Sequence, residues 1–213
     1  MMKTLILLSS AALLLAGSSI GAAESQVNLI RNPQFLETKS KNPNIPDGKR
    51  PHPWNVYGGL KALPEGCGVS KTEKPEGYGG NSYVIAGNCL VRQATLAVTP
   101  GKTYRVSCKV KTKDIAPTAV VRLQIIWLDK GWREIIKEWV DKNGKKQKSW
   151  VHQWTWVRSA PEWKELSIPA FTAPANAKYA MIRFGNEYTA KGSSVFADFK
   201  MEEIPSGTAD AAK

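Results

Sequence analysis

An all-β fold, an antiparallel β-sandwich, is predicted by three features of this 213-residue sequence. Several short runs alternate apolar with polar residues, the period-two pattern of half-buried strands. Turn-forming Gly, Pro, Asn and Asp residues separate these runs. No stretch shows sustained helical periodicity or an internal repeat. With 42% hydrophobic residues the chain can bury a core, and it most simply forms one domain.

The beginning of the chain is typical of a secretory signal peptide. Lys3 supplies the positive charge, residues 5–16 form the apolar centre, and Gly21-Ala22-Ala23 provides small residues for cleavage. The apolar run is too short to span a bilayer. We therefore expect a secreted or periplasmic protein with three parts: a signal peptide at 1–23, a sandwich domain at 24–204 and a disordered tail at 205–213.

Strands are expected in a regular order along the mature chain, with a long Lys-, Asn- and Pro-rich loop at residues 39–53. Residues 104–111 follow a tight turn at Thr99–Lys102. The expected strands are residues 27–30, a strand beginning at Trp54, and residues 83–86, 90–98, 104–111, 121–127, 163–168, 179–184 and 195–201.

Two of these strands define a candidate polar surface. In residues 104–111 the apolar side chains share one face, and Arg105 lies on the other. Residues 121–127 repeat the pattern, with Arg122 and Gln124 opposite the apolar face. We expect these two strands to be neighbours, so that their basic and hydrogen-bonding residues form one surface.

The segment from Lys130 to Arg158 is unusual because it holds five of the eight tryptophans. Asn143-Gly144 favours a hairpin turn between two extended stretches. In the second stretch Trp150, His152, Trp154 and Trp156 fall on one face. Such a stripe suits a sugar chain, because the C–H faces of pyranose rings pack on indole. The same stripe is equally consistent with core packing or with docking onto a partner protein.

Five pieces of the sequence resemble, in order, the carbohydrate-binding modules of the endoglucanase C type. The central piece is Leu96-Ala-Val-Thr-Pro-Gly-Lys-Thr-Tyr-Arg-Val-Ser-Cys-Lys-Val-Lys. The others begin at Asn28 (NLIRNPQF), Trp127 (WLDKG), Trp163 (WKELSIPAFTAPA) and Val195 (VFADFKM). The resemblance implies a jelly roll of the galactose-binding-like superfamily. It also implies structural roles for Trp127 and Trp163, and it does not specify the ligand.

These modules often hold a structural calcium, but the corresponding motif is altered in this chain. Pro33 and Leu36 replace the usual glycine and glutamate, and Ala197 replaces the first of two aspartates. Glu37 and Asp198 remain as candidate ligands. Calcium requires six to eight oxygen atoms, so the sequence favours a protein that requires no cofactor.

An odd number of cysteines, three, is present in a chain expected in an oxidising compartment. Cys67 and Cys89 lie in glycine-containing loop sequence, whereas Cys108 lies on the apolar face of its strand. The simplest assignment is a Cys67–Cys89 disulfide with Cys108 in the core. That disulfide would contribute on the order of 3 kcal/mol.

The formal net charge of +12 would attract a partner that carries negative charge. Nucleic acid is disfavoured because the chain carries an export signal and its basic residues do not gather in a recognition helix. Acidic polysaccharides are better candidates, although the charge alone is also explained by solubility.

Together these features predict a secreted, non-catalytic protein that binds a polysaccharide on a concave sheet. The candidate binding residues are Trp132, Trp139, Trp150, Trp154, Trp156, Arg105, Arg122, Gln124 and Arg183. One alternative is a β-sandwich polysaccharide lyase using Arg122, Gln124, His152 and Tyr188, although no motif of such enzymes is present. Another alternative is a cell-surface adhesion or scaffold module.

Overall fold

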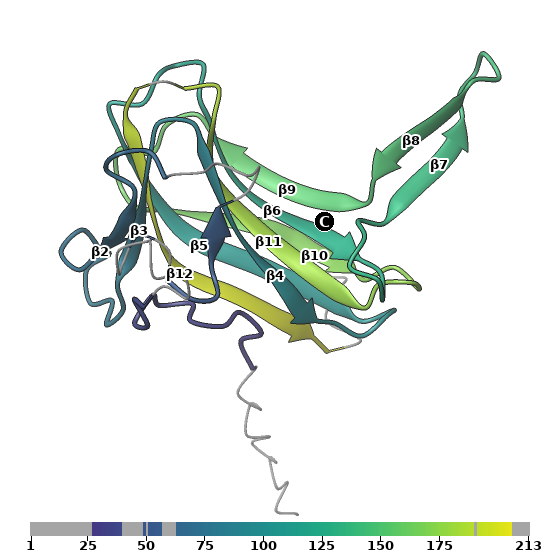
Figure 1. Ribbon diagram of the computed structural model, residues 1–213, viewed down its shortest axis with the longest axis horizontal. Helices are drawn as coiled ribbons and strands as arrows, with labels where there is room; N and C mark the ends of the chain where they lie inside the picture. The colour runs from purple at the N-terminus through teal and green to yellow at the C-terminus, as the bar shows by residue number, and fades with distance from the viewer. Residues whose placement is uncertain (1–26, 40–48, 50, 57–62, 190, 206–213) are drawn as a thin grey trace, which may run out of the picture.

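The computed structural model describes residues 27–39, 49, 51–56, 63–189 and 191–205. Two five-stranded antiparallel sheets pack against each other, and a third sheet of two strands projects from one end (Figure 1). The described residues contain no helix, so none of them forms a helix able to cross a membrane. The predicted all-β sandwich is confirmed. The expected signal peptide and residues 206–213 of the expected tail lie outside the described residues.

The first sheet has the strand order β1-β4-β11-β6-β9. Its strands are β1 (Asn55–Val56), β4 (Cys89–Ala97), β11 (Tyr179–Glu187), β6 (Val120–Leu128) and β9 (His152–Val157). The second sheet has the order β10-β5-β12-β3-β2. Its strands are β10 (Lys164–Thr172), β5 (Thr103–Lys113), β12 (Ser193–Ile204), β3 (Ser82–Ala86) and β2 (Gly68–Ser70).

The third sheet is a hairpin of β7 (Ile136–Val140) and β8 (Lys146–Trp150) that rises from the ends of β6 and β9 (Figure 1). Its turn contains Asn143-Gly144, as predicted, and Gly144 adopts a φ of 77°. Asp141 closes the turn, because its Oδ1 accepts hydrogen bonds from the backbone N–H groups of Asn143 (2.9 Å) and Lys145 (3.0 Å). The hairpin is therefore defined by its own turn chemistry.

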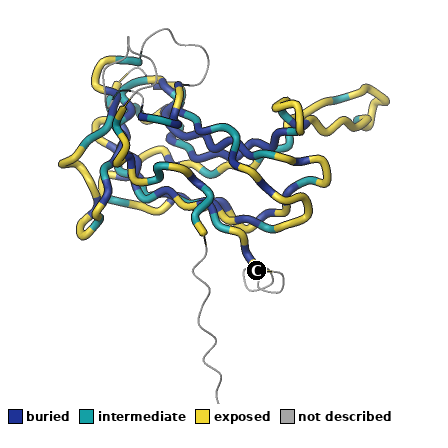
Figure 2. Tube along the Cα trace, turned by 60° about the horizontal axis from the view of Figure 1, so that its bottom comes forward, coloured by how far each residue is buried: buried dark blue, intermediate teal, exposed yellow. Residues whose placement is uncertain are grey.

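The core lies between the two large sheets, and Figure 2 shows buried residues running through this body. At one end Trp54 packs on Phe184 and Phe199, with ring centroids 5.3 and 5.2 Å apart. Towards the other end Trp127 lies 6.2 Å from Tyr104 of the opposite sheet. Trp127 and Cys108 are buried, so the predictions that place them in the core are confirmed.

The predicted pairing of residues 104–111 with residues 121–127 is wrong. The two segments lie in β5 and β6, which belong to different sheets and face each other across the core. Each strand buries the apolar face that the alternation predicts. Their polar faces consequently point to opposite sides of the sandwich.

Residues 27–30 do not form the predicted first strand. They follow the end of β12 irregularly: Asn28 Nδ2 donates to the Phe199 carbonyl (2.8 Å), and Asn28 Oδ1 accepts from the Met201 N–H (3.0 Å). The side chain of Gln93 holds both the N–H and the carbonyl of Arg31. Side chains thus supply bonds that a regular ladder would otherwise make.

Candidate functional site

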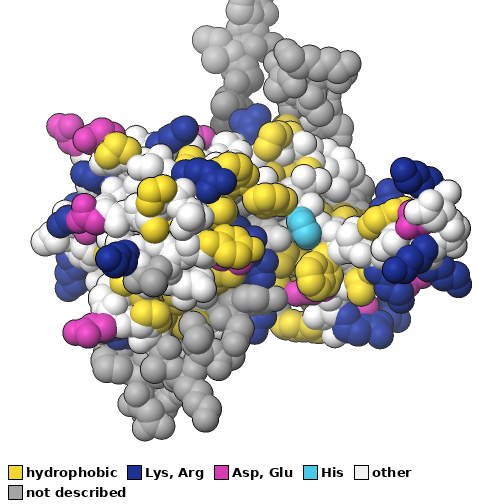
Figure 3. Space-filling view, turned by 90° about the horizontal axis from the view of Figure 1, so that it is seen from above, with side chains coloured by type: hydrophobic (Ala, Val, Ile, Leu, Met, Phe, Trp, Pro, Cys, Tyr) yellow, Lys and Arg dark blue, Asp and Glu magenta, His cyan; other side chains and the backbone are white. Residues whose placement is uncertain are grey.

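Large aromatic side chains are exposed on the outer face of the first sheet and on the hairpin. Their exposed fractions are 44% for Trp156, 48% for Trp154, 58% for Trp150, 43% for Trp139, 56% for Trp132 and 71% for Tyr188. Figure 3 shows hydrophobic side chains gathered across this face around a histidine, with lysines and arginines over the projecting hairpin. Exposed apolar groups that gather in this way mark an interaction surface.

β9 positions the central indoles of this surface. It pairs with β6 so that Trp156 lies opposite Arg122, Trp154 opposite Gln124, and His152 opposite Ile126. Directly opposed residues in an antiparallel pair point to the same side. The rings therefore stand beside a polar strip on β6, and successive rings are about 7 Å apart along β9.

The stretch predicted as one strand is divided at Val151 into β8 and β9. The Val151 N–H donates to the Ile135 carbonyl (2.8 Å), and its carbonyl accepts from the Trp127 N–H (3.4 Å). Val151 packs against the core. Its neighbours Trp150 and His152 therefore both point outward. We call Trp150, His152, Trp154 and Trp156 the ring row.

Trp139 lies on the other face of the hairpin. Trp150 pairs with Ile136, whereas Trp139 pairs with Gln147. Positions 136 and 139 are an odd number of residues apart, so their side chains project to opposite faces of the hairpin. The sequence could not predict that Trp139 and Trp150 lie on opposite faces of the hairpin, because the register of β7 against β8 is not evident from residue spacing.

Arg122, Gln124 and Arg183 meet on the outer face of the first sheet. Arg183 lies between Gln124 and Arg92 in the register, and its Nε donates to Gln124 Oε1 at 2.9 Å. Arg183 Nη2 donates to the same oxygen. Arg122 Nη2 forms an ion pair with Glu187 Oε1 at 2.7 Å. Gln124 and Arg183 are buried, with 3% and 9% of their surface exposed, so these contacts form a largely covered polar floor beside the ring row.

Arg105 does not belong to this surface. It lies on β5 opposite Glu202 of β12, on the outer face of the second sheet. The prediction that grouped Arg105 with Arg122 and Gln124 is therefore wrong. It assumed that β5 and β6 are neighbours in one sheet, whereas the chain crosses to the other sheet between them.

His152 is the titratable member of the ring row. Burial lowers its pKa below the usual value, and the positive charges of Arg183 and Arg122 lower it further. The imidazole is therefore neutral at neutral pH. Within the described part of the chain, its Nδ1 has no hydrogen-bond partner.

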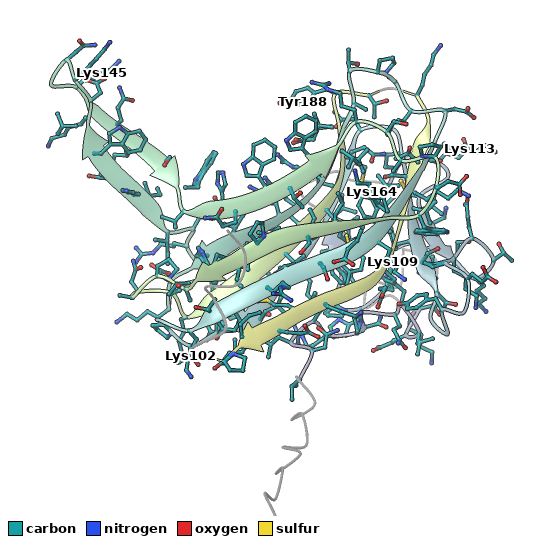
Figure 4. The ribbon with its side chains drawn as sticks, turned by 180° about the vertical axis from the view of Figure 1, so that it is seen from behind. Lys102, Lys109, Lys113, Lys145, Lys164 and Tyr188 are labelled. Atoms are coloured by element: carbon teal, nitrogen blue, oxygen red, sulfur yellow. The ribbon has the colours of Figure 1, made fainter. Side chains whose placement is uncertain are left out.

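Both ends of the ring row carry further side chains, and the sequence had singled out only Tyr188 and Trp132 among them. The Arg158 guanidinium lies 5.3 Å from the Trp156 ring centroid. Tyr188 lies at this end in Figure 4, far from Lys145 at the hairpin tip. Near the hairpin base, Trp132 contacts Tyr179 with centroids 5.0 Å apart. The alternation of residues 90–94 could have placed Arg92 on the outer face of the first sheet, beside Arg183. Arg158 could not be placed in this way, because it follows the last residue of β9.

Of the two candidate calcium ligands, Asp198 is paired with lysines and Glu37 lies at the surface. Asp198 Oδ2 lies 3.3 Å from Lys200 Nζ and 4.0 Å from Lys109 Nζ, so two ammonium groups already neutralise it. Glu37 is exposed and its backbone is held by Asn32. Among the described residues, no three His, Cys, Asp or Glu side chains gather to hold a metal ion.

Cys67 and Cys89 are in contact as buried free thiols, so the predicted disulfide is not formed in this structure. The Cys89 thiol donates a hydrogen bond to the Cys67 sulfur, and this bond, together with the Ala86 N–H and Lys49, lowers the pKa of Cys67 to about 7. The pKa of Cys89 is raised by the same bond.

No protein-family model and no curated protein matches the sequence. Among solved structures, the fold is similar to the enzymatically active domain of tailspike protein 4 from bacteriophage CBA120. The TM-score is 0.56 with 12% identity over 83% of this chain. This chain spans only 21% of the tailspike chain.

Two similar structures are much closer to this chain in length. TmCBM61, solved with β-1,4-galactotriose, has a TM-score of 0.49 and 16% identity over 84% of this chain and 100% of its own. The CBM22-1 xylan-binding domain of Paenibacillus barcinonensis Xyn10C has a TM-score of 0.47 and 18% identity over 86% of this chain and 98% of its own. At such identities the similarity concerns the fold alone. Solved carbohydrate-binding modules are among the structures with a similar fold, and the endoglucanase C type is not specified.

Proposed function

We propose that this protein binds a polysaccharide along the ring row on the outer face of the first sheet. One observation carries the proposal: Trp154 and Trp156 expose about half of their surface on the same side of β9, beside fixed hydrogen-bonding groups on β6. A sugar ring can pack its C–H face on each indole, and its hydroxyl groups can reach Arg122, which keeps some exposed surface beside the ring row. Burial of an aromatic side chain contributes roughly 1.5–3 kcal/mol.

The floor beneath the indoles is rigid because its side chains are already held, with Gln124 and Arg183 buried. Gln124 accepts from Arg183, and Arg122 is paired with Glu187. Preorganised groups of this kind lose little conformational entropy when a ligand binds. Trp156 is steadied in the same way by Arg158.

We further infer that the protein acts outside the cytoplasm, with residues 24–204 as its binding domain. The supporting feature is the signal-like sequence at residues 1–23. An oxidising compartment would also allow the adjacent thiols of Cys67 and Cys89 to form a disulfide.

Affinity electrophoresis tests the proposed function. The wild-type chain would be run through gels containing xylan, β-1,4-galactan, alginate or polygalacturonate, beside the variant Trp154→Ala/Trp156→Ala. We expect at least one polymer to retard the wild type, and the variant to migrate as it does in an empty gel. Trp139→Ala, on the far face of the hairpin, is the matched control and should be retarded like the wild type.

Two results would contradict the proposal. Migration unaffected by every polymer would favour an adhesion or scaffold role. An increase in ultraviolet absorbance from unsaturated sugar products, on incubation with alginate or polygalacturonate, would identify a lyase instead. The lyase would depend on His152, so His152→Gln would abolish that signal.

A further inference from the structure

The projecting hairpin has a second apolar surface on the same side as the ring row. A pocket of about 190 Å³ is lined by Ile136, Lys148, Ser149 and Trp150. Ile136 and Trp150 are directly paired across β7 and β8, so their side chains lie side by side. Trp150 is also a member of the ring row, which makes the pocket continuous with the proposed binding surface.

This hairpin is unusually exposed for a two-stranded sheet. All five residues of β7 are exposed, and Val140 joins Ile136 and Trp150 on the outward face. Isolated hairpins are only marginally stable in water. Figure 2 shows the hairpin standing clear of the buried body. An exposed apolar face that costs stability is expected where it binds a partner.

The charge of the hairpin indicates the chemistry of that partner. Residues 136–150 carry five lysines and only two carboxylates, Glu138 and Asp141. Asp141 is engaged by the turn and by Gln147 Nε2 at 2.8 Å. Glu138 lies 2.7 Å from Lys148 Nζ, at the wall of the pocket. The surroundings of the pocket therefore attract a negatively charged group.

We propose that this pocket is an additional subsite for a sugar residue that carries a negatively charged group. The inference rests on the proposed function and names its ligand class, an anionic polysaccharide. The sugar ring packs on Trp150 and Ile136, and the Lys148 ammonium leaves Glu138 to pair with the anionic group of the ligand. Trp150 and Trp156 are about 20 Å apart along the chain, so only a polymer of several residues reaches both the pocket and the far end of the ring row.

Two tryptophans on opposite faces of the hairpin provide a matched test. Binding of polygalacturonate, dextran sulfate and neutral β-1,4-galactan would be measured by calorimetry for the wild type, Trp150→Ala and Trp139→Ala. We expect Trp150→Ala to weaken binding of the anionic polymers by about tenfold. Trp139→Ala should leave it unchanged. Comparison of polygalacturonate with dextran sulfate distinguishes carboxylate from sulfate as the anionic group.

A second pair of variants tests the charge without removing a ring. Lys148→Glu should weaken binding of the anionic polymer and leave binding of galactan unchanged. Glu138→Gln should strengthen binding of the anionic polymer by about two- to fivefold, because Lys148 no longer has a competing carboxylate. A gain in affinity cannot result from misfolding, and the near-ultraviolet circular dichroism of each variant checks that the sandwich is intact.

The outcomes separate this inference from the proposed function. If Trp154→Ala/Trp156→Ala abolishes binding while Trp150→Ala and Glu138→Gln have no effect, the hairpin subsite is wrong and the proposed function stands. Equal losses for Trp150→Ala and Trp139→Ala would also overturn the subsite. If the wild type binds only galactan, the anionic ligand class is wrong. If it binds none of the polymers, both proposals fail.

Discussion

His152 places a titratable group in the middle of the ring row, and its environment makes a prediction about pH. Its pKa is lowered in the folded protein by burial and by the charges of Arg183 and Arg122. The unfolded chain therefore binds this proton at a higher pH than the folded chain, and stability falls as the pH drops below about 6.5. Urea unfolding would be measured at about pH 7.5 and about pH 5. Between these two values the free energy of unfolding should fall less for His152→Gln than for the wild type. Equal losses would contradict the neutral, partly buried imidazole.

Cys67 and Cys89 make a prediction about oxidation. Both thiols are buried, so oxidised glutathione should reach Cys67 only when the surrounding loops open locally, and the lowered pKa of Cys67, about 7, favours its attack above neutral pH. The resulting mixed disulfide is displaced by Cys89, so the two thiols lose two electrons and two protons to the glutathione. Titration under denaturing conditions should then find one free thiol of the three, and the free energy of unfolding should rise by roughly 3 kcal/mol. Three remaining thiols would disprove the pairing.

Individual side chains on β6 and β9 could be predicted from the sequence because alternation fixes their side of a strand. Trp154 and Trp156 share one face of β9, and Arg122 and Gln124 share one face of β6, as predicted. Alternation does not say whether that face is covered. Val157 is buried and Trp156 is exposed, although both are apolar residues of the same strand.

The pairing of β11 with β4 depends on Gly185, which has a φ of 139°. A Cβ at this position would overlap the Cys89 carbonyl oxygen of β4. Gly185→Ala should therefore destabilise the protein by more than about 2 kcal/mol. Gly87→Ala is the matched control, because Gly87 also has a positive φ (62°) but a Cβ added there would meet no atom within 4 Å. Gly87→Ala should lower the free energy of unfolding by only about 1 kcal/mol. Equal unfolding midpoints in urea for the two variants would contradict this packing.

At the scale of elements, the hairpin turn and most strands could be predicted from local sequence. Asn143-Gly144 predicted the turn, and Thr99–Lys102 predicted the turn before β5. The sheet that each strand joins could not be predicted, because it depends on pairing between residues far apart in the chain. β5 and β6 are consecutive but lie in different sheets, and this error alone placed Arg105 on the wrong side of the protein.

At the scale of the whole molecule, a buried polar contact joins the two sheets. Asn186 of β11 donates from Nδ2 to the Ile85 carbonyl of β3 (3.1 Å), and its Oδ1 accepts from the Ser194 hydroxyl. Asn186 and Ser194 are fully buried. Asn186→Ala leaves both partners without this bond and should destabilise the protein by about 1–3 kcal/mol. Asn55→Ala, at an exposed position, is the control and should have little effect on urea unfolding.

The tryptophans of the sandwich have two different positions. Trp54 and Trp127 are buried between the two sheets, whereas Trp154 and Trp156 are exposed on one outer face, beside the polar floor. The position of the proposed binding surface can be measured directly by NMR, because each of the eight tryptophans has one indole N–H resonance. On titration with an oligomer of the polysaccharide that retards the wild type, the resonances of Trp154 and Trp156 should shift most. Those of the buried Trp54 and Trp127 should stay in place. Saturable binding that leaves Trp154 and Trp156 unshifted would contradict the account.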